Sequence, residues 1–312
     1  MDDKIKLLIK DRYGFQIQSI VDAPRQFVAE TYIIESSKQK YFCKIITKPL
    51  FIPHVLDSLP ILKGIHQTGF DRLNYPISAL NGDLYQYQNN VLIVLFNYIE
   101  APQSFEYDNY ALGKLIASLH KITPPIGIFL PEENFSYKYQ NEFENQLTQI
   151  LIVNHEDKIV ISLQKLISKY ETEMKNDYDN FIKLSQKLKE TKQAKVITHG
   201  DPGGNILVKS PKDLYLIDWD DILLSAPERD TWFFQDNLKF IKGYQGVFSN
   251  YSPNPKLNHF FTYKRYFEDL MEYFTEILGS GSETYRLKNL KALEHDCFEG
   301  WLRPAIRQFK YQ

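Results

Sequence analysis

The chain has 312 residues, 43% of them hydrophobic, and a formal net charge of −2. This length is typical of about two domains with packed cores, and the near-neutral charge gives no basic surface for nucleic acid. No uncharged run of about 18 apolar residues could span a membrane, and residues 1–6 begin no apolar signal segment. Cys43 and Cys297 match no metal or disulfide pattern. We expect a cytoplasmic protein, a monomer or weak dimer, that binds neither nucleic acid nor membrane.

The first 96 residues carry mostly strand patterns, with runs of β-branched and aromatic residues separated by polar turns. One segment within them has apolar residues at helical spacing. In chain order, the predicted elements are a helix over 7–13, strands over 27–35 and 41–47, a helix over 55–67, and strands over 84–88 and 91–96 that meet in a hairpin around Asn89 and Asn90.

Beyond residue 96 the pattern becomes mainly helical. A connector containing Pro102 leads into a helix whose apolar residues lie on one face. A long polar-faced helix, a strand-loop-strand-turn-strand region and a final helical region follow. These elements are the connector 97–104, the helix from 111 to 119, the helix 143–192, the strand region 196–220 and the helical segment from 231 to the end.

The strand region holds oxygen-rich side chains at close spacing. Asp201 follows a strand, Asn205 lies four residues later, and Asp218 ends a second apolar strand. Phosphoryl transfer needs a carboxylate that accepts the acceptor's proton, and oxygen ligands that hold Mg²⁺ against the phosphates. We therefore assign Asp201 as the catalytic base and Asn205 and Asp218 as metal ligands, and we expect His199 to brace the catalytic loop. The alternative is that Asp201 and Asn205 only cap a turn.

These segments resemble the aminoglycoside phosphotransferase family, relatives of choline kinase and distant relatives of protein kinases. The resemblance is carried by Thr-His-Gly-Asp at 198–201, Asn-Ile-Leu-Val at 205–208 and Leu-Ile-Asp-Trp-Asp at 216–220. The run 217–230 is particularly similar to the spectinomycin phosphotransferases, and 112–120 is similar to the family's helix beyond the hinge.

The resemblance implies an α+β, bilobal, protein-kinase-like fold. A small antiparallel N-terminal lobe, 1–96, would bind the nucleotide. A larger helical lobe, 97–312, would carry the catalytic loop and the acceptor site, with a hinge at about 97–102. It also implies an enzyme that uses Mg²⁺ and ATP, with GTP possible, to phosphorylate a hydroxyl of a small cationic acceptor such as an aminoglycoside or aminocyclitol.

The same resemblance implies a set of nucleotide contacts. Lys44, on a predicted strand, would pair with the phosphates, and Asp57 on the following helix would orient it. Backbone groups near Asn97 and Ile99 would meet the adenine. For two of these residues the sequence leaves a plainer alternative, because an edge-strand Lys44 or a helical Asp57 can simply face solvent.

Two departures from the kinase pattern stand out. Only three residues separate Asp201 from Asn205, where kinases have four, and we expect Gly203 and Gly204 to adopt positive φ and shorten the path. No glycine occurs between Gly14 and Gly64, so the expected phosphate loop near 22–26 offers few bare N–H groups. In that loop Arg25 is a possible substitute cation.

Carboxylates suited to a cationic acceptor lie on the last long helical segment. The resemblance places Glu268 and Asp269 near the acceptor, with Asp220 adding acidity. Glu268, Glu272 and Glu276 share one helical face, which is equally typical of a solvated stripe. The acceptor therefore stays open. The alternatives are a housekeeping kinase for an amino alcohol or sugar, and a kinase-fold nucleotide-binding protein with weak or no catalysis.

Overall fold

The computed structural model describes residues 3–23, 29–49, 52–88, 90–152, 156–300 and 302–308. Contacts divide it into two compact units. The first unit comprises Met1–Glu132, Lys195–Asp230 and Asp236–Tyr251, and the second comprises Glu133–Ala194, Thr231–Gln235 and Ser252–Gln312. The first unit thus contains both the N-terminal strands and the catalytic motifs, and the functional division into 1–96 and 97–312 stays a prediction.

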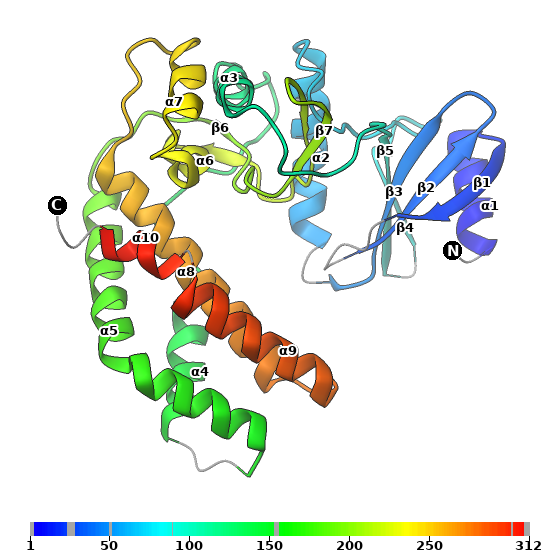
Figure 1. Ribbon diagram of the computed structural model, residues 1–312. Helices are drawn as coiled ribbons and strands as arrows, with labels where there is room; N and C mark the ends of the chain where they lie inside the picture. The colour runs from blue at the N-terminus through cyan, green and yellow to red at the C-terminus, as the bar shows by residue number, and fades with distance from the viewer. Residues whose placement is uncertain are drawn as a thin grey trace. The chain divides into compact units, whose positions relative to one another are not determined.

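A five-stranded antiparallel sheet forms the N-terminal part of the first unit, in the order β1-β2-β3-β5-β4 (Figure 1). Lys44 on the central strand β3 lies opposite Thr31 on β2 and Val94 on β5. Its backbone is therefore held from both sides. The strands are β1 (Ile17–Asp22), β2 (Glu30–Ser36), β3 (Lys40–Ile46), β4 (Gln86–Gln88) and β5 (Val91–Asn97).

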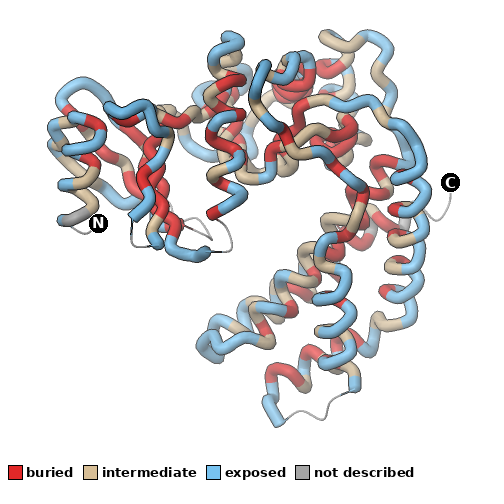
Figure 2. Tube along the Cα trace, turned by 180° about the vertical axis from the view of Figure 1, so that it is seen from behind, coloured by how far each residue is buried: buried red, intermediate tan, exposed pale blue. Residues whose placement is uncertain are grey.

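Helix α1 (Asp3–Tyr13) covers one face of this sheet. Its Ile9 and Tyr13 are buried in one apolar cluster with Ile34, Cys43 and Leu95 of the strands. At about 25 cal/mol per Å² of buried apolar surface, such a cluster is the main stabilising term for a small sheet. Figure 2 shows buried residues concentrated on the strands, with exposed residues at the turns.

The segment 72–77 connects the sheet to the catalytic strands. The N–H of Ile77 donates to Leu95 O on β5 (2.7 Å), and the N–H of Leu216 donates to Arg72 O (2.9 Å). Leu216 ends β8 (Asp213–Leu216), which pairs with β7 (Ile206–Ser210) in a hairpin. The same segment therefore contacts both the five-stranded sheet and the strand that leads to Asp218.

Helices α3 (Asn109–His120) and α7 (Leu238–Gln245) pack with their backbones in close approach. A Cβ on Gly113 would lie 2.1 Å from Phe240 O, and one on Gly243 would lie 2.0 Å from Tyr110 O. Only glycine fits at these two positions. The unit also contains α2 (Ile52–Gln67), the strand pair β6 (Val196–Thr198) and β9 (Leu223–Ser225), and the start of α6 (Glu228–Thr231).

The second unit is helical around an aromatic core. Phe143, Phe181, Phe260, Phe267 and Phe274 are buried there in stacked and edge contacts. Figure 2 shows the buried residues along one side of its long helices. Its elements are α4 (Gln140–Ile152), α5 (Lys158–Lys189), η2 (Trp232–Phe234), α8 (Pro255–Leu278), α9 (Glu283–Leu293), η3 (Glu294–Glu299) and α10 (Leu302–Gln308).

One sequence expectation about secondary structure needs correction, and one strand was missed. The single helix predicted over 143–192 is two helices, because Asp157 caps a new start by accepting from the N–H groups of Ile159 (2.8 Å) and Val160 (3.3 Å). Strand β1 was not predicted. The predicted strand start at 27, the loop containing Arg25 and the hairpin residue Asn89 lie outside the described residues. Among the described helices, none is long and apolar enough to cross a membrane.

Candidate active site

The loop after β6 is held by a buried carboxylate. Asp230 accepts from the backbone N–H of His199 at Oδ2 (2.8 Å) and from that of Gly200 at Oδ1 (2.7 Å). Gly200 has φ of 102°, and a Cβ there would lie 2.4 Å from Nη2 of Arg229. Arg229 in turn donates to Thr198 Oγ1 (3.0 Å). The backbone of His199 and Gly200, immediately before Asp201, is therefore held by hydrogen bonds to Asp230.

His199 makes hydrogen bonds to both sides of this loop. Its Nδ1 accepts from the N–H of Asp201 (3.3 Å), and its Nε2 lies 2.8 Å from Ile217 O. A carbonyl oxygen can only accept, so the imidazole carries its proton on Nε2 and is neutral in this geometry. The ring also packs on buried Trp219, at 4.5 Å between centroids. His199 thus links the residue before Asp218 to the residue that we assign as base.

The shortened loop brings the backbone of Asn205 beside Ile217, the residue before Asp218. The N–H of Ile217 donates to Asn205 O (3.0 Å), and Asn205 Nδ2 donates to Asp201 O (2.9 Å). The expectation for the glycines needs correction, since the positive φ belongs to Gly200, and Gly204 is not among the residues with positive φ. The turn through residues 202–204 closes the path instead.

The donor set around Asn205 and Asp218 suits Mg²⁺. Because the Asn205 amide nitrogen is engaged, its oxygen is the atom left to face a cation, and Asp218 adds a carboxylate. Within the described residues, no group of three His, Cys, Asp or Glu side chains forms a metal cage.

Asp218 has a backbone φ of 64°, in the left-handed region. Such a conformation costs about 1–3 kcal/mol in a residue other than glycine, and it is often found at functional sites. The turn directs Asp218 and Asp220 toward the same partner. Nζ of buried Lys44 lies 3.2 Å from Asp218 Oδ1 and 2.6 Å from Asp220 Oδ2.

Charge and burial shift the pKa values of Lys44 and Asp220. Burial lowers the pKa of Lys44, but the carboxylates of Asp220 and Asp218 outweigh it and raise that pKa above its ordinary value. Burial also raises the pKa of Asp220, while Lys44 opposes the shift. The result is a buried lysine held in its charged form by two carboxylates.

The expected pairing of Lys44 with Asp57 needs correction. Asp57 is exposed on α2, whereas Lys44 contacts Asp218 and Asp220. Asp220, expected on the acceptor side, is instead paired with Lys44. The turn after β8 brings the carboxylates of Asp218 and Asp220 within hydrogen-bonding distance of the buried Nζ of Lys44, whereas Asp57 faces solvent.

The connector backbone is already partly hydrogen-bonded. Asn97 N donates to Tyr75 O (3.1 Å), its Oδ1 accepts from Tyr75 N (2.6 Å), and Ile99 O accepts from Ala101 N (2.9 Å). Farther along, the N–H of Val208 donates to Pro102 O (2.8 Å), so the connector runs beside β7. An adenine contact near Asn97 and Ile99 stays a prediction.

The two predicted acceptor residues lie in the second unit, on α8. Asp269 forms an ion pair with Arg265 one turn earlier, at 2.7 Å between Oδ1 and Nε. Burial raises the pKa of Asp269 to about 7, with Arg265 opposing and Glu272 adding to the shift. Glu268 lies on the same helix, directly before Asp269. Their acceptor role stays a prediction.

Sequence reasoning missed a buried network beneath the loop. His120 Nε2 lies 3.0 Å from Asp230 Oδ2, and His120 Nδ1 lies 2.7 Å from the hydroxyl of Tyr244. Burial alone would raise the pKa of Asp230, but the hydrogen bond and charge of His120, with Arg229, hold that pKa below its ordinary value. His120 and Asp230 fall inside the family-like segments 112–120 and 217–230, and that resemblance was the only sequence signal for them.

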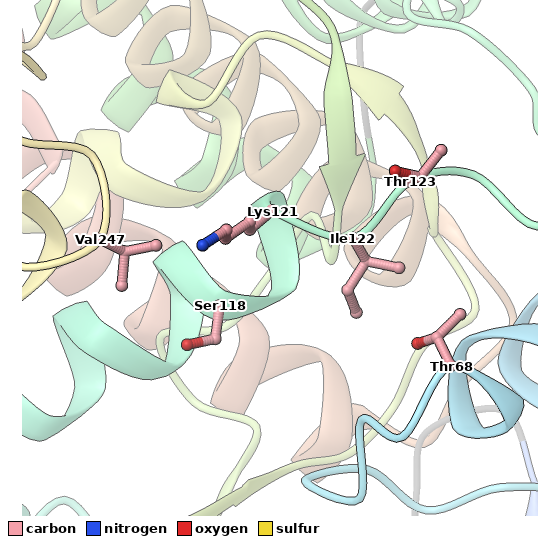
Figure 3. A pocket seen from close by; sticks show the side chains of 6 residues that line it. All are labelled: Thr68, Ser118, Lys121, Ile122, Thr123 and Val247. Carbon is pink, nitrogen blue, oxygen red and sulfur yellow. The ribbon is translucent and has the colours of Figure 1, made fainter.

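A separate open cavity of about 430 Å³ lies at the C-terminal end of α3 (Figure 3). None of the predicted site residues lines it. The lining residues are Thr68, Ser118, Lys121, Ile122, Thr123 and Val247.

Comparison with known proteins identifies the fold. No family model and no curated protein matches the chain. Among solved structures, a spectinomycin phosphotransferase in complex with ADP and spectinomycin superposes with a TM-score of 0.83, at 22% identity over 100% of this chain and 99% of that one. The chain has the fold of a phosphotransferase. This confirms the predicted α+β, kinase-like fold class and the family resemblance at the level of the fold.

Two kinases of small amino alcohols have the same fold. A microcompartment-associated aminopropanol kinase gives a TM-score of 0.68 at 15% identity, covering 100% of this chain and 99% of that one. The choline kinase LicA from Streptococcus pneumoniae gives 0.60 at 14% identity, covering 99% of each. The phosphotransferase fold therefore accommodates both types of acceptor, and the fold alone does not choose between them.

Proposed function

We propose that the protein is an ATP- and Mg²⁺-dependent O-phosphotransferase, with GTP as a possible donor, that phosphorylates a hydroxyl of an aminoglycoside or aminocyclitol. One observation carries the proposal. Lys44 contacts Asp218, whose neighbour Ile217 is hydrogen-bonded to Asn205, four residues after Asp201. This supports a site in which Lys44 would bind phosphate, Asn205 and Asp218 would hold a metal and Asp201 would act as base, all four belonging to one compact unit.

In this proposal each side chain has one task. Lys44 binds the nucleotide phosphates, and Asn205 and Asp218 hold Mg²⁺, which neutralises phosphate charge when bound. Asp201 accepts the proton of the acceptor hydroxyl while the hydroxyl oxygen forms a bond to the γ-phosphorus. The bond from that phosphorus to the bridging oxygen breaks, and ADP leaves with the electron pair. The brace through His199 and Asp230 keeps Asp201 in place during the transfer.

The acceptor class rests on one support. Of the solved structures described above, the one with the highest TM-score contains spectinomycin, an aminocyclitol, together with ADP. Glu268 and Asp269 stay candidate acceptor residues from the sequence, and Asp269 is already paired with Arg265.

Thermal unfolding with and without Mg-ATP tests the nucleotide site. Wild type should be stabilised, and ligand at 100 times its Kd is worth about 2.7 kcal/mol. Asp218→Asn should lose most of this shift. Asn is the appropriate replacement because it tolerates the left-handed backbone that Asp218 adopts. If wild type shows no shift with Mg-ATP or Mg-GTP, the nucleotide-dependent function is wrong.

An acceptor panel tests the substrate class. Spectinomycin, other aminocyclitols, aminoglycosides, choline and aminopropanol are incubated with Mg-ATP, and phosphorylated product is measured by mass spectrometry. We expect transfer to an aminocyclitol or aminoglycoside, and decreased drug susceptibility on expression. The similarity to the two amino alcohol kinases supports the alternative, and turnover of choline or aminopropanol alone would establish it.

A further inference from the structure

Lys44, the proposed phosphate-binding lysine, is paired with carboxylates that do not come from helix α2. Helix α2 contains a single carboxylate, Asp57, and that side chain is exposed. Nζ of Lys44 instead lies 2.6 Å from Asp220 Oδ2, its shorter contact, and 3.2 Å from Asp218 Oδ1. A buried ammonium needs a carboxylate that stays with it, because an unpaired charge is costly to bury.

Of these two carboxylates, only one is left for Lys44 in the proposed reaction. Asp218 is assigned to the metal, so its oxygens are shared with the cation when nucleotide binds. Asp220 is the nearer carboxylate and has no other task in that scheme. It is also well positioned, because its neighbour Trp219 is buried, donates from Nε1 to Leu216 O (3.1 Å) and packs on His199.

We propose that Asp220 is the positioning residue that orients Lys44 toward the nucleotide phosphates, in place of a carboxylate from α2. This inference rests on the proposed phosphotransferase function. It moves Asp220 from the acceptor side, where the sequence placed it, to the nucleotide side. It also explains how a chain without an inward-facing acidic residue on α2 can keep a charged lysine at the centre of its sheet.

A double-mutant cycle on nucleotide affinity tests the proposal. The Kd for Mg-ATP is measured for wild type, Asp220→Asn, Lys44→Met and the double variant, with folding verified by circular dichroism. Asp220→Asn should weaken binding by about tenfold or more, which corresponds to about 1.4 kcal/mol. In the Lys44→Met background, the same substitution should change Kd by less than about twofold, because its target is gone.

Two matched controls remove one carboxylate each. Asp57→Asn tests the helix carboxylate, and Asp221→Asn tests an exposed neighbour of Asp220. Both should leave the Kd for Mg-ATP within about twofold of wild type, the range expected when no coupled group is removed. A loss of affinity in Asp57→Asn comparable to that in Asp220→Asn would overturn the proposal.

Steady-state kinetics separates the other possible tasks of Asp220. Asp220→Asn should raise the KM for ATP and leave the KM for the acceptor unchanged. A raised acceptor KM, or a loss of Mg-ATP affinity that persists in full in the Lys44→Met background, would show an acceptor or metal role and overturn the inference. If wild type binds no nucleotide, the proposed function fails and this inference fails with it. Normal binding with additive losses refutes the inference alone.

Discussion

His120 and Asp230, 110 residues apart in the chain, form a buried pair directly beneath the catalytic loop, with 3.0 Å between Nε2 and Oδ2. Because a carboxylate can only accept, His120 must carry a proton on Nε2 whatever its charge. Asp230 then receives three donors, from His120 and from the backbone of His199 and Gly200. The position of Asp201 therefore depends on a helix far away in the sequence.

Asp230→Asn should destabilise the protein and reduce turnover. The amide has one acceptor oxygen for three donors, and it turns an NH₂ group toward a buried N–H. Each buried donor left without an acceptor costs about 1–3 kcal/mol. The measurements are urea unfolding and kcat. Asp236→Asn, at an exposed position, is the control, and equal losses in the two variants would contradict this account.

His120 can be tested by keeping or removing its donor. His120→Gln places an amide N–H near the position of Nε2 and should retain much of the stability. His120→Leu leaves Asp230 and the hydroxyl of Tyr244 without their partner and should lose about 1–3 kcal/mol more than the Gln variant. The readout is the difference between the two in urea unfolding. Equal stabilities would show that the hydrogen bond contributes nothing.

Gly200→Ala should damage the loop, whereas Gly204→Ala should not. Gly200 has φ of 102°, and its Cβ would clash with Arg229. A Cβ on Gly204 would meet no atom within 4 Å. We expect Gly200→Ala to cost at least about 1–3 kcal/mol, the range for strained backbone, and to lower kcat. Gly204→Ala should match wild type in both unfolding free energy and kcat.

Gly113→Ala should force α3 and α7 apart, because its Cβ would lie 2.1 Å from a backbone oxygen that cannot rotate away. An added methyl in a well-packed contact costs about 1–3 kcal/mol. Lys114→Ala, at the adjacent exposed position of α3, is the matched control and should be nearly neutral. A stable Gly113→Ala variant in thermal unfolding would mean that this helix contact is not tight.

Much of the fold follows from local patterns in the sequence. The predicted strand at 41–47 appears as β3, and the predicted helix at 55–67 appears within α2, because a run of β-branched and aromatic residues and a helical spacing are each local to one segment. The catalytic strands were found for the same reason. Strand β1 was missed because its residues do not alternate cleanly between apolar and polar, although it pairs with β2 in the sheet.

The partners of the site residues could not be predicted in the same way. Lys44 and Asp220 are 176 residues apart, and His120 and Asp230 are 110 apart. Which carboxylate reaches a buried cation is decided by the turn at Asp218 and by the packing of Trp219, neither of which has a local sequence signal. The sequence therefore identified most residues of the candidate site, while the structure supplied their pairing.

Asp269 should make the stability of the protein depend on pH. Burial raises its pKa from an ordinary value of 3.8 to about 7, so the folded state favours the protonated carboxyl. In the unfolded chain the group ionises near pH 4. Its contribution to stability is therefore greatest at low pH, falls as pH rises from about 4 to about 7, and is fully lost above that. At 1.36 kcal/mol per pKa unit, the penalty reaches about 4 kcal/mol.

Asp269→Asn isolates this effect, since the amide is neutral at every pH. At pH 4 the variant and wild type should unfold at similar urea concentrations. At pH 8 the variant should gain stability relative to wild type, although loss of the ion pair with Arg265 offsets part of the gain. Urea unfolding at several pH values between 4 and 8 measures the difference. A constant difference across this range would show that Asp269 ionises normally in the folded protein.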